Sequence, residues 1–161
     1  MDAQTFAANQ LENHAKSFIK CLTETPEEHF HTDPPAGGHS VAWHALHTAD
    51  WNRVLVSPKL EGVTPETRFA YLGWEDKPWA QVVTGTGPAS LADSKAKILE
   101  LVTAEFERGV QDIRSASPAQ LEQKVPTPTG EREVMSMIVG QIRHVAYHWG
   151  QAKMVATQLA K

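Results

Sequence analysis

The sequence predicts an all-α protein, a four-helix bundle, and three observations lead to this fold class. Four segments carry apolar residues three or four positions apart, the spacing of one helix face. No stretch of useful length alternates apolar and polar residues as a half-buried strand would. Prolines gather between the four segments, where they interrupt helices. With 161 residues, we expect one domain spanning residues 1–161.

The first two helices are expected over residues 3–23 and 40–56. Asp2 and Ser40 stand immediately before them, and both residue types accept hydrogen bonds from the free amides of a first helical turn. Residues 26–38 contain three prolines and a glycine pair, so irregular structure is predicted between the two helices.

The third helix is expected over residues 90–115, with a cap in the segment Ser90 to Asp93, and the fourth over residues 131–161. Between the second and third helices lies a long connection, residues 58–89, which is rich in both proline and aromatic residues. Aromatic side chains favour packing over disorder, so we expect short helical turns lying on the bundle. This connection is long enough to cross the bundle, so the second and third helices are expected to run parallel.

Charge and composition exclude several classes of function. A formal net charge of −4 without a basic run argues against a nucleic-acid surface. No apolar run approaches the ~20 residues that a membrane span needs, and the N-terminus lacks the pattern of a signal peptide. Cys21 is the single cysteine, which excludes an internal disulfide and favours a cytoplasmic location.

His144 and His148 are the most informative residues of the chain. On a helix, residues four apart lie about 40° from one another, one turn above the other, so both imidazoles can reach one metal ion. Both lie on the face of the fourth helix that we expect to be buried. A buried neutral imidazole needs partners for both ring nitrogens, and a metal supplies one of them. Core histidines with ordinary hydrogen bonds are the alternative.

His47 is predicted to be the third ligand, because it lies on the inward face of the second helix. His44 is rotated towards the flank, where a histidine is more often a boundary residue; supporting the ligands or facing substrate is the alternative. Asp50 also points inward. There its carboxylate could orient an imidazole by accepting the free ring N–H, or it could form an ion pair with an arginine. Gln151 follows the histidine stripe and could bind a ligand, a water, a substrate or a neighbouring helix.

Three neutral histidines with an open position are typical of a catalytic divalent metal site. Zinc and nickel are favoured, with iron and manganese as alternatives. Such an ion can lower the pKa of a thiol and act as a Lewis acid in S-transfer to a small-molecule substrate. Hydrolysis by metal-bound hydroxide would use the same ligands. A non-catalytic bundle that binds metal or a small ligand in a stress response is the third hypothesis.

The chain resembles the DinB/YfiT-like superfamily of metal-dependent enzymes. The resemblance rests on the run from Ser40 to His47, on the terminal segment from His144 to Gln151, and on four helices with a long middle connection. It implies an up-down-down-up bundle, metal ligands at His47, His144 and His148, and activity as a transferase or isomerase that uses a low-molecular-weight thiol such as bacillithiol, mycothiol or glutathione. His44 is a second candidate for the first ligand position.

A homodimer is expected on two grounds. Trp51 and Trp149 fall outside the central stripes of their helices, and exposed tryptophans often mark a partner surface. The resemblance also implies a protein that often dimerises.

Overall fold

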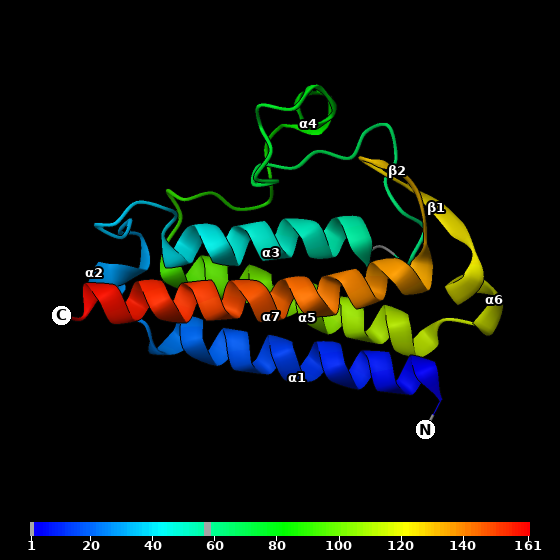
Figure 1. Ribbon diagram of the computed structural model, residues 1–161, viewed down its shortest axis with the longest axis horizontal. Helices are drawn as coiled ribbons and strands as arrows, with labels where there is room; N and C mark the ends of the chain where they lie inside the picture. The colour runs from blue at the N-terminus through cyan, green and yellow to red at the C-terminus, as the bar shows by residue number, and fades with distance from the viewer. Residues whose placement is uncertain (1, 57–58) are drawn as a thin grey trace.

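Four long helices lie side by side and make up most of the protein (Figure 1). The computed structural model describes residues 2–56 and 59–161, including all of their side chains except those of residues 54 and 55. The long helices are α1 (Ala3–Glu24), α3 (Val41–Leu55), α5 (Lys95–Ser115) and α7 (Val134–Leu159). The short elements are α2 (Glu27–Phe30), α4 (Pro78–Val83), α6 (Pro118–Glu122), β1 (Lys124–Thr127) and β2 (Gly130–Glu133). The described chain is therefore mostly helical, as the sequence predicts.

The predicted caps of the first two long helices are confirmed. The Asp2 carboxylate accepts a hydrogen bond from the Thr5 amide, and the Ser40 hydroxyl accepts one from the Trp43 amide. Each satisfies an amide that has no partner inside its helix. The helix α3 ends at Leu55, close to the expected residue, and Pro58 lies outside the described residues.

The start of the third long helix was predicted too early. Ser94 is its cap, because the Ser94 hydroxyl accepts from the Lys97 amide and the helix begins at Lys95. The earlier Ser90 and Asp93 instead close a turn of their own, in which the Ser90 amide donates to the Asp93 carboxylate at 2.7 Å. Two serines four residues apart give nearly equal cap signals, and the second one caps the helix.

A β-hairpin stands where the sequence predicted a loop and the start of the fourth helix. The strands β1 and β2 pair antiparallel from Lys124 opposite Glu133 to Thr127 opposite Gly130, and α7 begins only after them, at Val134. Each strand has four residues, and β2 is exposed throughout, so no alternation marks it in the sequence. Residues 26–38 also differ from the prediction of irregular structure, because they contain the one-turn helix α2.

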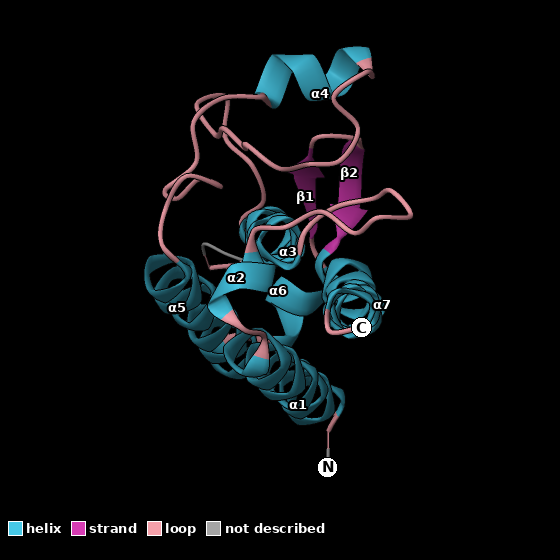
Figure 2. Ribbon diagram, turned by 90° about the vertical axis from the view of Figure 1, so that its left-hand side faces the viewer, coloured by secondary structure: helices cyan, strands magenta, loops and turns pink. Residues whose placement is uncertain are grey.

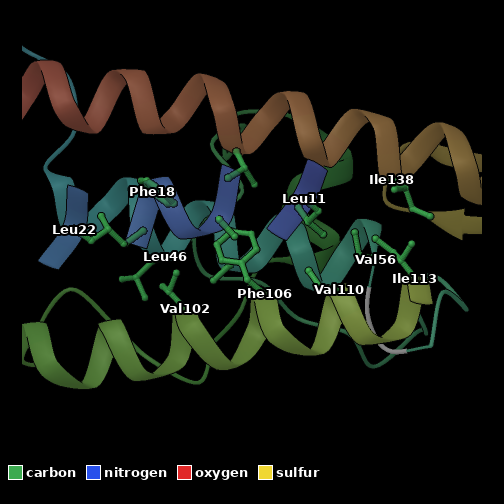
Figure 3. Close-up of a cluster of buried hydrophobic side chains, with 14 of the residues drawn as sticks. Leu11, Phe18, Leu22, Leu46, Val56, Val102, Phe106, Val110, Ile113 and Ile138 are labelled. Carbon is green, nitrogen blue, oxygen red and sulfur yellow. The ribbon is translucent and has the colours of Figure 1, made fainter. Parts of the chain in front are cut away.

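The four long helices share one hydrophobic core. The helices α1 and α3 each pack against both α5 and α7, as the end-on view shows (Figure 2). Figure 3 shows how side chains from all four helices interleave at the centre. The largest fully buried apolar side chains of this core are Leu11, Phe18, Leu22, Phe30, Leu60, Ile98, Phe106, Ile113 and Ile138.

The connection between α3 and α5 passes over α3 and contains the helical turn α4, so a helical turn is present as predicted. The turn does not lie on the bundle, because α4 stands on the outer side of the connection, away from the long helices (Figures 1 and 2). Phe69 and Leu72 anchor it in a small cluster of their own, against which Trp51 packs. The Trp51 indole donates to the Leu72 carbonyl at 3.0 Å. Trp51 and Trp149 are both half-buried, so the expectation that they stand exposed is wrong. Within the described ranges, none of the helices combines the length and apolar character of a membrane span.

Candidate metal centre

His47, His144 and His148 come together where α3 packs against α7. Each offers one ring nitrogen, and the three nitrogens lie within 4.8 Å of one another. The His144 and His148 ring centroids are 4.5 Å apart, so the four-residue spacing does place both rings on one face of α7. The three residues that the sequence singles out as ligands therefore form one group.

The protonation pattern of His47 follows from its neighbour on the α3–α5 connection. The His47 Nδ1 atom lies 2.7 Å from the backbone carbonyl oxygen of Tyr71. A carbonyl oxygen only accepts hydrogen bonds, so Nδ1 carries the proton and donates it. Because burial lowers the pKa of His47 to about 3, the ring is neutral near pH 7 and its Nε2 atom carries a lone pair.

Gly73 lets the connection approach His47 closely. It has a positive φ of 82°, and a Cβ atom at this position would lie 3.1 Å from His47 Cε1. A residue with a side chain would be strained in this backbone conformation and would push against the imidazole. The glycine therefore allows the Tyr71 carbonyl to lie within hydrogen-bonding distance of the ring.

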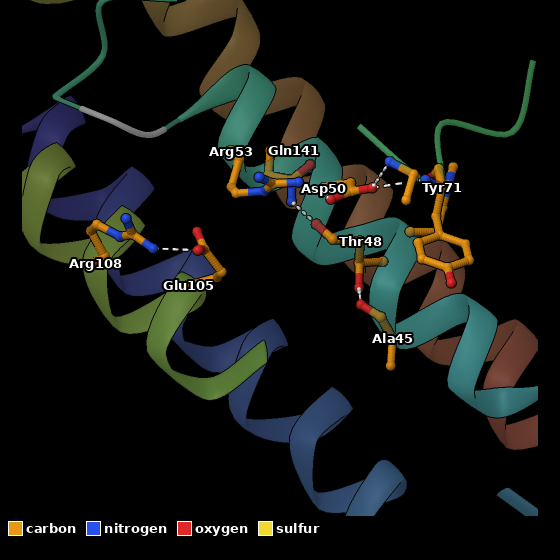
Figure 4. A network of polar contacts seen from close by, with 10 residues as sticks. Ala45, Thr48, Asp50, Arg53, Tyr71, Glu105, Arg108 and Gln141 are labelled. Carbon is orange, nitrogen blue, oxygen red and sulfur yellow. Dashed lines mark hydrogen bonds and ion pairs between the residues drawn. The ribbon is translucent and has the colours of Figure 1, made fainter. Parts of the chain in front are cut away.

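Asp50 acts on this connection and not on an imidazole. Its Oδ2 atom accepts hydrogen bonds from the backbone amides of Ala70 at 3.0 Å and Tyr71 at 2.8 Å, and Oδ1 pairs with Arg53 (Figure 4). Of the two roles expected for Asp50, the ion pair with an arginine is the one observed. The Asp50 side chain fixes the backbone segment whose Tyr71 carbonyl holds His47. It therefore acts on the imidazole through this backbone and not directly, as the sequence had suggested.

Gln141 fixes the protonation pattern of His144 in the same way. Its side chain is fully buried, and its Nε2 atom donates to the Thr48 carbonyl oxygen at 3.2 Å. Its Oε1 atom therefore faces His144 Nδ1, at 3.3 Å, and must accept the ring proton. Sequence reasoning missed Gln141, although a glutamine one turn before His144 on a buried stripe was a usable signal.

The two neutral rings turn lone pairs towards each other. The Nε2 atoms of His47 and His144 are 3.0 Å apart, and both Nδ1 protons are already directed elsewhere. Protonation of one ring would place a proton between them, but burial lowers the pKa of each to about 3. Two nitrogens bound to one tetrahedral zinc ion at ~2.0–2.1 Å would lie roughly 3.3 Å apart, so the pair is close to the separation of two metal ligands.

His44 lies beside this group, as a partner of His148. The Nδ1 atoms of the two rings are 2.9 Å apart, so one donates a hydrogen bond to the other. Burial lowers the pKa of His44 to about 4 and that of His148 to about 3, so both rings are neutral at pH 7. His44 is thus close enough to orient His148, whereas His47 belongs to the three-nitrogen group itself.

A cavity of about 330 Å³ opens beside His44 and His148. Gln151 lines it, and so does His39, which stands just before α3. His39 stacks on Trp43 with ring centroids 3.7 Å apart, and Trp43 in turn stacks on His47 at 4.5 Å. The other residues of the lining are Trp43, Pro34, Ala36, Gly37, Gly38, Tyr147, Met154, Val155 and Gln158. A small molecule in this cavity would lie against the histidine group.

Comparison with known proteins bears on the fold and on the family of the chain. Among solved structures, a conserved protein from Enterococcus faecalis has the same fold, with a TM-score of 0.63, 15% sequence identity, and coverage of 100% of this chain and 99% of that one. No curated protein matches the sequence. The family model described as the DinB superfamily matches residues 10–152, which is most of the chain and includes all three histidines of the group. The chain therefore belongs to the DinB superfamily.

Proposed function

We propose that His47, His144 and His148 bind one divalent metal ion. The observation that carries this proposal is the pair of Nε2 lone pairs facing each other at 3.0 Å, since a bound cation would turn their repulsion into attraction. The third nitrogen lies within 4.8 Å of both, so the three can share one ion. Imidazole ligands favour zinc or nickel, with iron or manganese as alternatives.

His44 supports this site through His148. A neutral imidazole that binds a metal through Nε2 carries its proton on Nδ1, and the His148 Nδ1 atom faces His44 Nδ1 at 2.9 Å. His44 then accepts that hydrogen bond and fixes the ring, as carboxylates and carbonyls do at other metal sites. In the same way, the Tyr71 carbonyl oxygen accepts the Nδ1 proton of His47, and the Gln141 side-chain oxygen accepts that of His144.

The chemistry that we propose is thiol transfer or isomerisation on a small molecule. A divalent ion with three histidine ligands keeps an open position and lowers the pKa of a bound thiol. The cavity beside His148 would hold the thiol or its electrophile, and Gln151 offers amide groups for hydrogen bonds to it. A nucleophilic thiol supplied by a cosubstrate requires no catalytic cysteine, and Cys21 lines none of the cavities that contain the histidines.

Metal analysis followed by turnover assays tests this function. Protein purified without an affinity tag is analysed for metal content, then incubated with bacillithiol, mycothiol or glutathione and a panel of electrophiles. We expect about one metal per chain and thiol consumption that stops on chelation. Metal-dependent ester or amide hydrolysis without thiol would favour a hydrolase, and bound metal without turnover would favour a binding module. Absence of metal under all conditions would contradict the metal site.

Gln141→Met is expected to weaken metal binding 10–100-fold, the usual cost of losing an orienting partner. Methionine fills a similar volume but leaves the His144 Nδ1 proton without an acceptor, so the ring can change tautomer or rotate. Metal affinity is measured by competition with a chelator, and the tautomer of His144 in the metal-free protein by ¹⁵N NMR. Gln151→Met, on the same helix but facing the cavity, is the control and should retain full affinity.

The same proposal includes the finer points of architecture. The four long helices would form an up-down-down-up bundle as one domain over residues 1–161, working as a homodimer in the cytoplasm. The contacts of α1 and α3 with both α5 and α7 support the bundle, and the homodimer rests on the family resemblance alone. Light scattering of the purified protein after size exclusion measures the mass: a monomer would contradict the dimer.

A further inference from the structure

A second cavity, of about 340 Å³, is lined by His144 of the histidine group. Its lining consists of Trp51, Trp74, Gly140, Arg143, His144 and Tyr147. Tyr147 also lines the cavity beside His148, so the two cavities meet at this side chain. A molecule in the second cavity would lie against His144, while one in the first would lie against His148.

Aromatic rings form its walls, and one of them is held firmly. The Trp51 indole N–H donates to the Leu72 carbonyl oxygen at 3.0 Å, which fixes the ring. Trp74 meets it edge to face, with centroids 5.6 Å apart, and remains 44% exposed. Such rings offer flat apolar surfaces to the body of a ligand.

Gly140 leaves the floor of the cavity open. A Cβ atom at this position would meet nothing within 4 Å, so no close approach of another helix requires a glycine here. Glycine in the middle of a helix is less stable than alanine, and packing does not explain it at Gly140. The missing side chain at Gly140 leaves open space against α7, and a ligand could occupy this space.

Arg143 gives the cavity a positive charge. Its side chain is exposed, and among the described residues it forms no ion pair. The lining contains no acidic residue, so the guanidinium has no competing anion there. A guanidinium binds a carboxylate through two parallel hydrogen bonds, which gives both attraction and orientation.

We propose that this cavity binds a small monocarboxylate with an aromatic or aliphatic body. The carboxylate pairs with Arg143, and the body lies between Trp51, Trp74 and Tyr147, over Gly140. Its role as the compartment for one of two reactants rests on the proposed function, because it places that reactant beside His144. The binding itself does not depend on a metal.

NMR titration of the metal-free protein with 3-phenylpropionate tests the proposal. We expect the indole N–H signals of Trp51 and Trp74 and the Gly140 amide to shift in a saturable manner. The neutral amide 3-phenylpropanamide, which has the same body without the charge, should bind roughly tenfold more weakly, since a charged hydrogen-bonded pair at an exposed position lies at the low end of its range.

Variants separate the charge from the cavity. Arg143→Met should weaken 3-phenylpropionate binding roughly tenfold and leave the amide unchanged, whereas Arg132→Met, at an exposed arginine on β2, should change neither. Gly140→Leu should abolish binding of both by filling the floor. Equal binding of acid and amide, or shifts confined to other residues, would overturn the proposal. A protein that binds metal but not the acid would contradict this inference alone, and the reverse would contradict only the metal site.

Discussion

His148→Ala is expected to reduce bound metal from about one ion per chain to almost none. His148 supplies one of three nitrogens within 4.8 Å of one another, and two imidazoles alone hold a divalent ion weakly. Loss of an orienting partner already costs 10–100-fold in affinity, so loss of a ligand should cost more than ~100-fold. Competition with a chelator of known affinity measures the change, and circular dichroism checks that the helices remain.

Three further histidine variants sharpen this result. His31→Ala removes an exposed histidine that is not part of the three-nitrogen group and should leave metal binding unchanged. His44→Ala removes only the partner of His148 Nδ1, so its loss should stay within 10–100-fold, whereas His47→Ala should match His148→Ala. Equal metal content in His148→Ala and the unchanged protein would rule out the three-histidine site.

The metal-free protein is expected to lose stability steeply as the pH falls below about 6.5. Burial is the main cause that lowers the pKa of His44 to about 4 and those of His47, His144 and His148 to about 3. In the unfolded chain these groups titrate near 6.5. Urea titrations of chelator-treated protein at pH 7.5, 6.5, 5.5 and 4.5 measure the effect.

The direction of this dependence follows from proton binding. Above pH 6.5 the histidines are neutral in both the folded and the unfolded chain, so the free energy of unfolding has its full value. Between 6.5 and the folded pKa values of about 3 to 4, the unfolded chain binds protons that the folded chain excludes, so the free energy of unfolding falls. Each histidine contributes up to ~1.4 kcal/mol per pH unit.

The His44→Asn variant assigns the effect to the buried rings. It removes one histidine whose pKa is lowered, so it should flatten the slope by up to one proton. Added metal should preserve stability to lower pH, because it binds only the folded state. Constant stability of the metal-free protein from pH 7.5 to 4.5 would show that these histidines are accessible to protons in the folded chain.

Helical segments were predictable because their signals are local. The caps at Asp2 and Ser40 and the apolar stripes of the long helices are contained within a few neighbouring residues. The hairpin was missed because its strands are short and β2 is exposed on both faces. The start of α5 was misplaced because Ser90 and Ser94 are both suitable caps, and Ser90 instead closes a turn with Asp93.

The sequence by itself determined four long helices, and it determined that His144 and His148 share one face, since both depend on helical periodicity alone. Only the tertiary structure decided how His47 and His144 are protonated. That depends on the Tyr71 carbonyl and the Gln141 amide, one from a distant connection and the other held by Thr48 of α3. Hydrogen bonds between segments remote in sequence leave no periodic signal, so the facing lone pairs become visible only once the helices have packed.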